Sequence, residues 1–210
     1  AIHIALRGLF PEGGARIVIA DYLCRSVYDA VMMAGCEPVL VDIDPTHLSP
    51  DVEKTKVLAP DAVVVAHICG IRAPIELFMD TGLTVIEDCA QASGAEYKGK
   101  KVGSMGTVGC FSFFPTKNLS CIGDGGLATT NDKTINNKIR SLGEYGWDKK
   151  RDAQSIGINS RLDELQAAIL NVKLKYLDQD NKERRDIASS YRSRINNSKI
   201  HHPIEMDYSY

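Results

Sequence analysis

The sequence lacks any long hydrophobic run. No apolar stretch in its 210 residues is long enough to cross a bilayer, so a membrane-spanning helix is not expected. Charge of one sign does not dominate either, because 25 lysines and arginines are interspersed with 27 aspartates and glutamates. A nucleic-acid-binding protein or a protein of the membrane surface is typically far more basic. The sequence therefore predicts neither a nucleic-acid partner nor a membrane partner.

Cysteines are scattered, and no two of them are spaced as Cys-x-x-Cys. The six are Cys24, Cys36, Cys69, Cys89, Cys110 and Cys121. Without that spacing a zinc site is not expected, and we predict no metal ligands. Most of these cysteines lie inside apolar runs, which is typical of a reduced, cytoplasmic protein.

Two glycine-rich signatures of phosphate binding are also missing. Neither the G-x-G-x-x-G turn of dinucleotide-binding proteins nor the G-x-x-x-x-G-K-[ST] loop of ATP-binding proteins occurs. The sequence contains no internal repeats and no low-complexity tracts. These absences disfavour a dinucleotide-binding enzyme, an ATP-binding enzyme and a repeat protein.

Short apolar runs alternate with helical patterns along the chain. We expect buried strands at residues 16–20, 38–42, 62–67, 84–88, 108–113 and 126–130, and helices at 22–34, 74–81, 132–142, 161–176 and 178–195. This alternation predicts an α/β fold with a mostly parallel sheet. The last two strands are close in sequence, so we expect part of the sheet to be antiparallel.

The ends of the sequence resemble the interior of a longer chain. Residues 1–6 already have the pattern of an amphipathic helix, and no closing element precedes Tyr210. We therefore expect a fragment of a larger enzyme. Frayed termini of a complete domain are the alternative.

Two chemically capable residues follow predicted strands. The strand at 84–88 ends in two acids, Glu87 and Asp88, and a buried acid costs desolvation energy unless it meets a positive partner. Lys117 follows the strand at 108–113 after a proline turn, among apolar and small residues. A desolvated lysine becomes a nucleophile able to form a Schiff base. The alternatives are a turn aspartate and an ordinary surface lysine.

Gln91 and Ser112 lie in the same stretch of sequence. In doubly wound folds ligands bind at the carboxyl ends of the strands, which is where these polar residues fall. A carboxylate for a pyridinium nitrogen, a hydroxyl for a phosphate and a Schiff-base lysine are what pyridoxal 5'-phosphate (PLP) requires. The sequence therefore predicts a PLP site.

Several motifs in register resemble one family of PLP enzymes. VIEDCAQASG at 85–94, GSMG at 103–106, CFSFFPTKNL at 110–119 and GDGG at 123–126 are similar to the DegT/DnrJ/EryC1/StrS sugar aminotransferases. GINSRLDELQAA at 157–168 resembles a later signature of the same family. The likeness covers nearly the whole chain in the expected order.

The resemblance implies an aspartate-aminotransferase-like large domain, with a mostly parallel central sheet and helices on both faces. Residues 1–177 would form this PLP-binding domain without its N-terminal part. Residues 178–210 would form a linking helix and the start of a truncated C-terminal small domain.

The resemblance also implies roles for single residues. Lys117 would hold PLP covalently and shuttle protons, and Asp88 would pair with the pyridine nitrogen. Gln91 would contact the ring region of the cofactor, and Ser112 would bind its phosphate. Asn159 would reach the phosphate of the neighbouring subunit's cofactor, so the protein would be a homodimer with shared active sites. Helix capping remains the alternative for Asn159.

Two positions near the expected site are less typical. Cys24 occupies the place where the family usually stacks an aromatic residue over PLP, and a thiol packs there less well. Tyr22 is a candidate substitute for that aromatic residue. His67, in the motif AHICG, is expected to be a structural strand-end histidine rather than a catalyst.

The implied activity is transfer of an amino group from glutamate or glutamine to a keto sugar of a nucleotide-sugar, in polysaccharide or antibiotic sugar biosynthesis. The family also includes enzymes that aminate cyclitols and enzymes that dehydrate sugars. Members that dehydrate often replace the lysine with histidine, so Lys117 favours transamination. A non-PLP α/β enzyme and a regulatory protein that keeps the PLP fold without catalysis stay open as other classes.

Overall fold

The computed structural model describes residues 1–202, and residues 203–210 lie outside the described part. The elements in chain order are α1 (Ile2–Leu9), β1 (Arg16–Ala20), α2 (Arg25–Met33), β2 (Glu37–Val41), α3 (Val52–Leu58), β3 (Ala62–Ala66), the 3-10 turn η1 (Ile68–Gly70), α4 (Ile75–Met79), β4 (Thr84–Asp88), β5 (Glu96–Tyr97), β6 (Lys100–Lys101), β7 (Val108–Ser112), β8 (Gly126–Thr129), α5 (Lys133–Gly143), α6 (Glu164–Leu174) and α7 (Leu177–Arg194).

A six-stranded sheet in the order β2-β1-β3-β4-β7-β8 forms the centre of the molecule. The first five strands are parallel to one another, and β8 runs antiparallel to β7. Both the mostly parallel sheet and its antiparallel end are as the sequence predicts. Strands β5 and β6 form a separate two-stranded hairpin.

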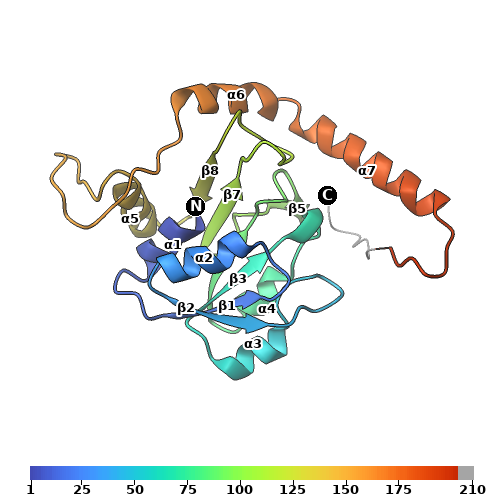
Figure 1. Ribbon diagram of the computed structural model, residues 1–210, viewed down its shortest axis with the longest axis horizontal. Helices are drawn as coiled ribbons and strands as arrows, with labels where there is room; N and C mark the ends of the chain where they lie inside the picture. The colour runs from blue at the N-terminus through green and yellow to red at the C-terminus, as the bar shows by residue number, and fades with distance from the viewer. Residues whose placement is uncertain (203–210) are drawn as a thin grey trace.

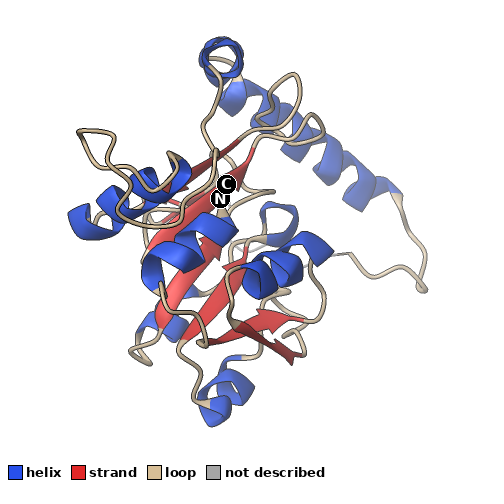
Figure 2. Ribbon diagram, turned by 60° about the vertical axis from the view of Figure 1, so that its left-hand side comes forward, coloured by secondary structure: helices blue, strands red, loops and turns tan. Residues whose placement is uncertain are grey.

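Helices cover both faces of this sheet (Figure 2). Alternate residues along each strand point to opposite faces, so the buried valines and isoleucines divide into two cores. Ile17, Val64 and Ile86 pack with α1 and α2 on one face. Val63 and Val85 pack with Phe78 of α4 on the other face. This two-sided burial explains why the strands are nearly continuous apolar runs.

Several boundaries differ from the sequence-based expectation. Helix α2 begins at Arg25 rather than at residue 22, because Cys24 has extended backbone angles and its carbonyl accepts the first helical amide, that of Val27. Helix α3 was not predicted, and its seven residues begin after Asp51, whose side chain accepts the amide of Lys54. Helix α5 begins after Asp132, whose carboxylate caps it by accepting the amides of Thr134 and Ile135.

Helices α6 and α7 lie outside the two layers that cover the sheet (Figure 1). Leu177 is the one buried residue of α7, and the helix runs away from the body of the molecule. None of the helices in residues 1–202 combines the length and apolar character that crossing a bilayer requires.

Candidate active site

A pocket lies at the carboxyl ends of β1, β3, β4 and β7. The connection that leaves β1 runs to β2 on one side, and the connection that leaves β3 runs to β4 on the other side. The two connections diverge between the neighbouring strands β1 and β3, which is where doubly wound sheets bind their ligands. Five residues that the sequence assigns to a cofactor line this pocket: Cys24, Asp88, Gln91, Ser112 and Lys117. The structure therefore brings together side chains that are up to 93 positions apart, from Cys24 to Lys117.

Asp88 is the last residue of β4 and is buried, with 7% of its surface exposed. Its Oδ1 atom accepts the backbone N–H of Ala90 at 3.0 Å. Burial raises the pKa of Asp88 above its ordinary value, while the Ala90 amide and the positive charge of Lys117 oppose that rise. A carboxylate in this position is stabilised when a cation binds opposite it.

Lys117 ends a tight turn that begins after β7. Its backbone N–H donates to the carbonyl of Phe114 at 2.9 Å. Phe113 closes the longer loop that follows, because it donates to Gly125 and accepts from Cys121. The side chain of Lys117 lines the pocket but is only half-buried, so its desolvation in this chain is less complete than its apolar neighbours suggest.

Gln91 and Ser112 present polar groups to the same pocket. The Oε1 atom of Gln91 accepts the backbone N–H of Cys69 at 2.7 Å, which leaves the amide nitrogen as the donor for a ligand. Cys69 has a left-handed backbone (φ 55°), so this contact fixes an unusual turn beside the pocket. The Ser112 hydroxyl, at the end of β7, accepts only a long contact of 3.4 Å from the amide of Phe114.

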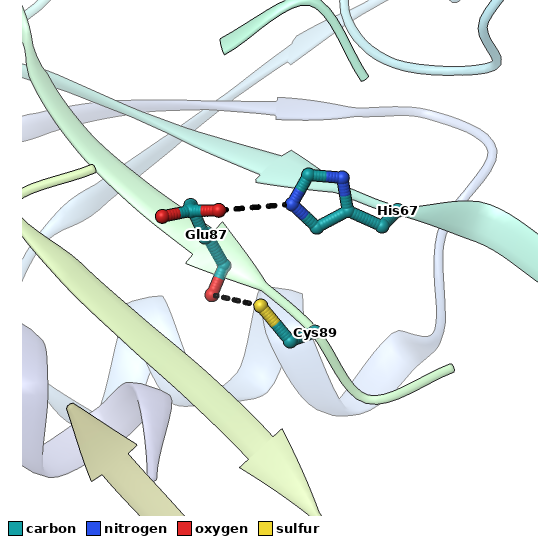
Figure 3. Close-up of side chains that lie close together, drawn as sticks. All are labelled: His67, Glu87 and Cys89. Atoms are coloured by element: carbon teal, nitrogen blue, oxygen red, sulfur yellow. Dashed lines mark hydrogen bonds and ion pairs between the residues drawn. The ribbon is translucent and has the colours of Figure 1, made fainter. Parts of the chain in front are cut away.

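Glu87 is a buried centre of hydrogen bonds that was not assigned from the sequence (Figure 3). Its carboxylate contacts His67 Nε2 at 3.1 Å and accepts the backbone amides of Gly103 at 2.8 Å, Met105 at 2.8 Å and Gly106 at 2.6 Å. Burial opposes its ionisation, but the bonds from His67 and from the glycine amides outweigh burial and hold the pKa of Glu87 below its usual value. The sequence feature that could have predicted this role is the pair of acids at the end of a buried strand, because both carboxylates need hydrogen-bond donors there.

His67 also lines the pocket, but both of its ring nitrogens are used in hydrogen bonds, as expected for the structural role that the sequence predicts. Nδ1 accepts the amide of Ala73 at 3.1 Å, which leaves Nε2 as the nitrogen that donates to Glu87. Glu87, His67 and Cys89 have ligand-type atoms within 4.8 Å of one another. His67 and the Glu87 carboxylate already use their acceptor atoms in hydrogen bonds, and burial raises the pKa of the Cys89 thiol well above its ordinary range, which disfavours the thiolate that a metal ion would bind. This cluster therefore does not suit a metal ion.

The model of the DegT/DnrJ/EryC1/StrS aminotransferase family matches residues 1–209. The chain belongs to this family. It is 45% identical, over 99% of its length and 59% of the relative's, to a protein of Aneurinibacillus thermoaerophilus named dTDP-3-amino-3,6-dideoxy-alpha-D-galactopyranose transaminase. It is 41% identical, over 91% of its length and 53% of the relative's, to the "Pleiotropic regulatory protein" of Geobacillus stearothermophilus. The chain thus spans little more than half the length of these relatives.

Solved structures of the family have the same fold. DesV of Streptomyces venezuelae, in complex with a ketimine intermediate, superimposes with a TM-score of 0.92 at 33% identity, over 100% of this chain and 58% of that one. NtdA of Bacillus subtilis, with bound cofactor PMP, gives a TM-score of 0.83 at 26% identity, over 92% of this chain and 46% of that one. The aspartate-aminotransferase-like α/β fold expected from the sequence is therefore confirmed.

Cys24 occupies the N-terminal cap of α2 at the mouth of the pocket in this family member. The Ser26 hydroxyl lies 3.1 Å from its sulfur and lowers the pKa of the thiol, with a smaller contribution from the charge of Lys117. Tyr22 is 60% exposed and is not among the described residues that line the pocket. In this structure Tyr22 therefore does not replace the missing aromatic residue.

Asn159 lies outside the pocket. It forms a bridge with Glu144, and its Oδ1 accepts a 3.3 Å hydrogen bond from Arg161. The side chain is exposed, and it does not cap α6, which begins after Asp163. A single chain does not bring Asn159 to its own cofactor pocket, so the role predicted for it requires a second chain.

Proposed function

We propose that the protein to which this chain belongs is a PLP-dependent aminotransferase. Its reaction would move an amino group from an amino acid, glutamate or glutamine, to a keto sugar carried by a nucleotide. The observation that carries this proposal is the meeting of Lys117 and Asp88 in one pocket at the carboxyl ends of the sheet. The relative named as a dTDP-amino-sugar transaminase supports the class of substrate.

The donor set of the pocket suits PLP. Lys117 supplies a primary amine that can bind an aldehyde covalently. Asp88 supplies a buried carboxylate for the pyridine nitrogen, Ser112 a hydroxyl for the phosphate, and Gln91 an amide donor for the ring. Bound PLP would supply an electron sink that stabilises negative charge on the carbon of the substrate.

Residues of the chain would carry out the proton transfers and stabilise the charge of the cofactor ring. Lys117, once free of the cofactor, would take a proton from the α-carbon of the amino donor and return a proton to the acceptor. Asp88 would keep the pyridine nitrogen protonated, because its buried carboxylate is stabilised by that positive charge. His67 and Glu87 would stay out of the proton transfer, since each already uses its donors and acceptors.

The test is the visible absorbance of the full-length protein after addition of PLP, together with an assay of amino transfer to nucleotide keto sugars. The wild-type protein is expected to develop the band of lysine-bound PLP and to catalyse the transfer. Lys117→Ala is expected to lose both. A band that persists unchanged in Lys117→Ala would reject this assignment of the lysine.

Two other functions share the same pocket. The relative named as a pleiotropic regulatory protein favours a regulatory role without turnover. Cofactor binding without amino transfer to any keto sugar would support that role. Cyclitol amination or sugar dehydration would instead be revealed by the substrate that reacts and by the product that forms.

We further propose a homodimer with shared active sites. The exposed Asn159 would then contact the cofactor of the neighbouring chain, and the exposed Leu165, Val172 and Leu174 of α6 would add apolar surface for that contact.

We also propose the division into a large domain at 1–177 and a linking helix with the start of a small domain at 178–210, of which residues 203–210 lie outside the described part. Six free cysteines are consistent with a cytoplasmic location.

A further inference from the structure

The segment that follows Lys117 is held by side chains of α6 and α7. Gln166 of α6 accepts the amide of Ile122 at 2.9 Å and donates to the carbonyl of the same residue. Lys173, also on α6, donates to the Ser120 hydroxyl at 2.9 Å. Two positions of the loop after Lys117, Ser120 and Ile122, are thus bonded to α6. A third position is bonded to α7.

The third position of the loop is Asn118, the residue next to Lys117, which contacts Asn181 of α7. Asn118 Nδ2 donates to Asn181 Oδ1 of α7 at 3.1 Å and to the carbonyl of Ser93 at 2.7 Å. Asn181 Nδ2 donates to the same Ser93 carbonyl at 3.0 Å. This triangle of hydrogen bonds joins α7 to the segment carrying Lys117 and to the segment that follows Asp88 and Gln91.

The spacing of these residues gives one continuous stripe. Gln166, Leu170, Lys173, Leu177 and Asn181 follow one another at intervals of three or four residues, which places them on one helical face. Lys175 and Tyr176, between the two helices, keep right-handed helical angles (φ −66°, ψ −21° and φ −106°, ψ −7°), so the stripe continues across the junction.

On the loop side the contacts fall at every second residue, Asn118, Ser120 and Ile122, as in an extended chain. The two segments run in opposite directions, since Ile122 meets Gln166 and Asn118 meets Asn181. Between the polar contacts, Leu170 and Leu177 are buried with Phe113 and Leu119. The loop after Lys117 is therefore fixed along its length by alternating polar and apolar contacts.

The triangle is tightly packed. A Cβ atom added to Gly94 would lie 2.8 Å from Asn181 Nδ2 and 3.2 Å from a methyl carbon of Leu177, so α7 approaches the backbone closely. Within residues 1–202, Ser93 Oγ and Asn118 Oδ1 are buried without a hydrogen-bond partner. Such unsatisfied groups are rare in folded proteins, because burying a polar atom without a partner lowers the stability of the fold.

We propose that Asn181 is a positioning residue for Lys117, acting through Asn118. This inference rests on the proposed function, because it concerns the lysine that would hold PLP. Asn181 is the last residue of α7 with a side-chain contact to the body of the chain among those described, and beyond it the helix is largely exposed. The orientation of the lysine is thereby coupled to the helix that leaves the domain.

The experiment compares full-length wild-type protein with Asn181→Ala and with the control Asn137→Ala. Asn137 is an exposed asparagine on α5, so its replacement repeats the chemical change away from the site. The measurements are the pH at the midpoint of the absorbance change of lysine-bound PLP, kcat, KM and thermal stability. Asn181→Ala is expected to bind PLP, to shift that midpoint and to lower kcat roughly 10-fold to 100-fold with little change in KM, because small misplacements of a catalytic group have effects of this size. Asn137→Ala is expected to match wild type.

Asn118→Ala breaks the same contact from the other side and is the second variant. Each replacement removes the Asn118–Asn181 bond together with one bond to the Ser93 carbonyl, so both break the same triangle. The double variant is therefore expected to lower kcat no further than the more affected single variant does. Wild-type midpoint and kcat in Asn181→Ala, with only thermal stability reduced, would overturn the inference, and so would fully additive effects of the two replacements. Failure of the proposed function is distinguishable, because wild-type protein would then show no lysine-bound PLP band at all.

Discussion

Asp88 is a buried acid that lines the pocket, and its proposed partner is the pyridine nitrogen of PLP. In the full-length enzyme, Asp88→Asn keeps the shape of the side chain and removes the charge opposite the pyridine nitrogen. We expect amino transfer to fall by about 100-fold or more, since removing one preorganised electrostatic partner has effects of this order. Steady-state kinetics measure the loss, with the exposed Asp80→Asn as a control that keeps full activity.

The same replacement has the opposite effect on the stability of the protein without cofactor. The folded-state pKa of Asp88 is raised, so ionising it costs folding free energy at neutral pH and costs nothing at low pH, where the group is protonated. Asn avoids that cost. Asp88→Asn is expected to melt at a higher temperature than wild type at neutral pH, with the difference vanishing below the ordinary Asp pKa of 3.8. An equal or lower melting temperature at neutral pH would contradict the burial argument.

The cysteines report where the cofactor binds. Cys24 and Cys69 are exposed, whereas the other four are buried, so an alkylating reagent is expected to modify the first two rapidly. Of these two exposed thiols Cys24 lines the pocket and Cys69 does not, and hence PLP should slow the alkylation of Cys24 while leaving that of Cys69 unchanged. Mass spectrometry of the peptides measures both rates. Equal protection of the two thiols, or of neither, would place the cofactor elsewhere.

The sequence predicts which side chains line the pocket, because its motifs fall at the ends of strands. Asp88, Gln91, Ser112, Lys117 and Cys24 all reach the pocket. Most of their hydrogen-bond partners are two or three residues away in the sequence, but the partner of Gln91 is distant and could not be predicted. The bond from the Cys69 amide to Gln91, for instance, depends on a left-handed turn that no local pattern in the sequence marks.

Glu87 shows how one side chain holds several elements together. It joins β4 to His67 after β3 and to the turn at residues 103–106. In Glu87→Gln an amide nitrogen would face backbone N–H donors, so we expect a loss of roughly 3 kcal/mol in the free energy of unfolding, measured with urea. Glu53→Gln, on an exposed side chain paired with Lys56, is the control and should change stability by less than about 1 kcal/mol.

The pH dependence of that difference follows from the sign of the shift. The folded-state pKa of Glu87 is lowered, so its stabilising effect is present above the ordinary carboxyl pKa of 4.5 and is lost as the pH falls through the lower folded value. The gap between wild type and Glu87→Gln is therefore expected to shrink in acid. A gap that is constant with pH would show that shape, rather than charge, is what the site requires.

Among the elements, the long apolar strands were predictable and the short polar elements were not. Helix α3 has only seven residues, and only Thr55 in it is buried, so it has little hydrophobic periodicity to detect. Strands β5 and β6 have two residues each, and their hairpin depends on left-handed angles at Lys98 and Gly99. In both cases a local feature, the Asp51 cap of α3 or the turn between β5 and β6, defines the element without an apolar pattern that would predict it.

At the scale of the whole molecule, the position of Asn159 makes a prediction about subunits. If each site takes Lys117 from one chain and Asn159 from the other, Lys117→Ala and Asn159→Ala are each expected to be impaired as homodimers. Mixing the two variants under conditions that exchange subunits should then restore activity, because a mixed dimer contains one site with both native residues. Activity of the mixture equal to the average of its parts would argue for self-contained sites.

The central claim is that Lys117 forms the covalent bond with PLP. The most direct measurement treats full-length protein and PLP with borohydride, which fixes the cofactor on the amine that holds it, and locates the added mass by peptide mapping. The account predicts the label on the peptide containing Lys117, with no stoichiometric label in Lys117→Ala. A stoichiometric label on any other lysine, or none in wild-type protein, would contradict it.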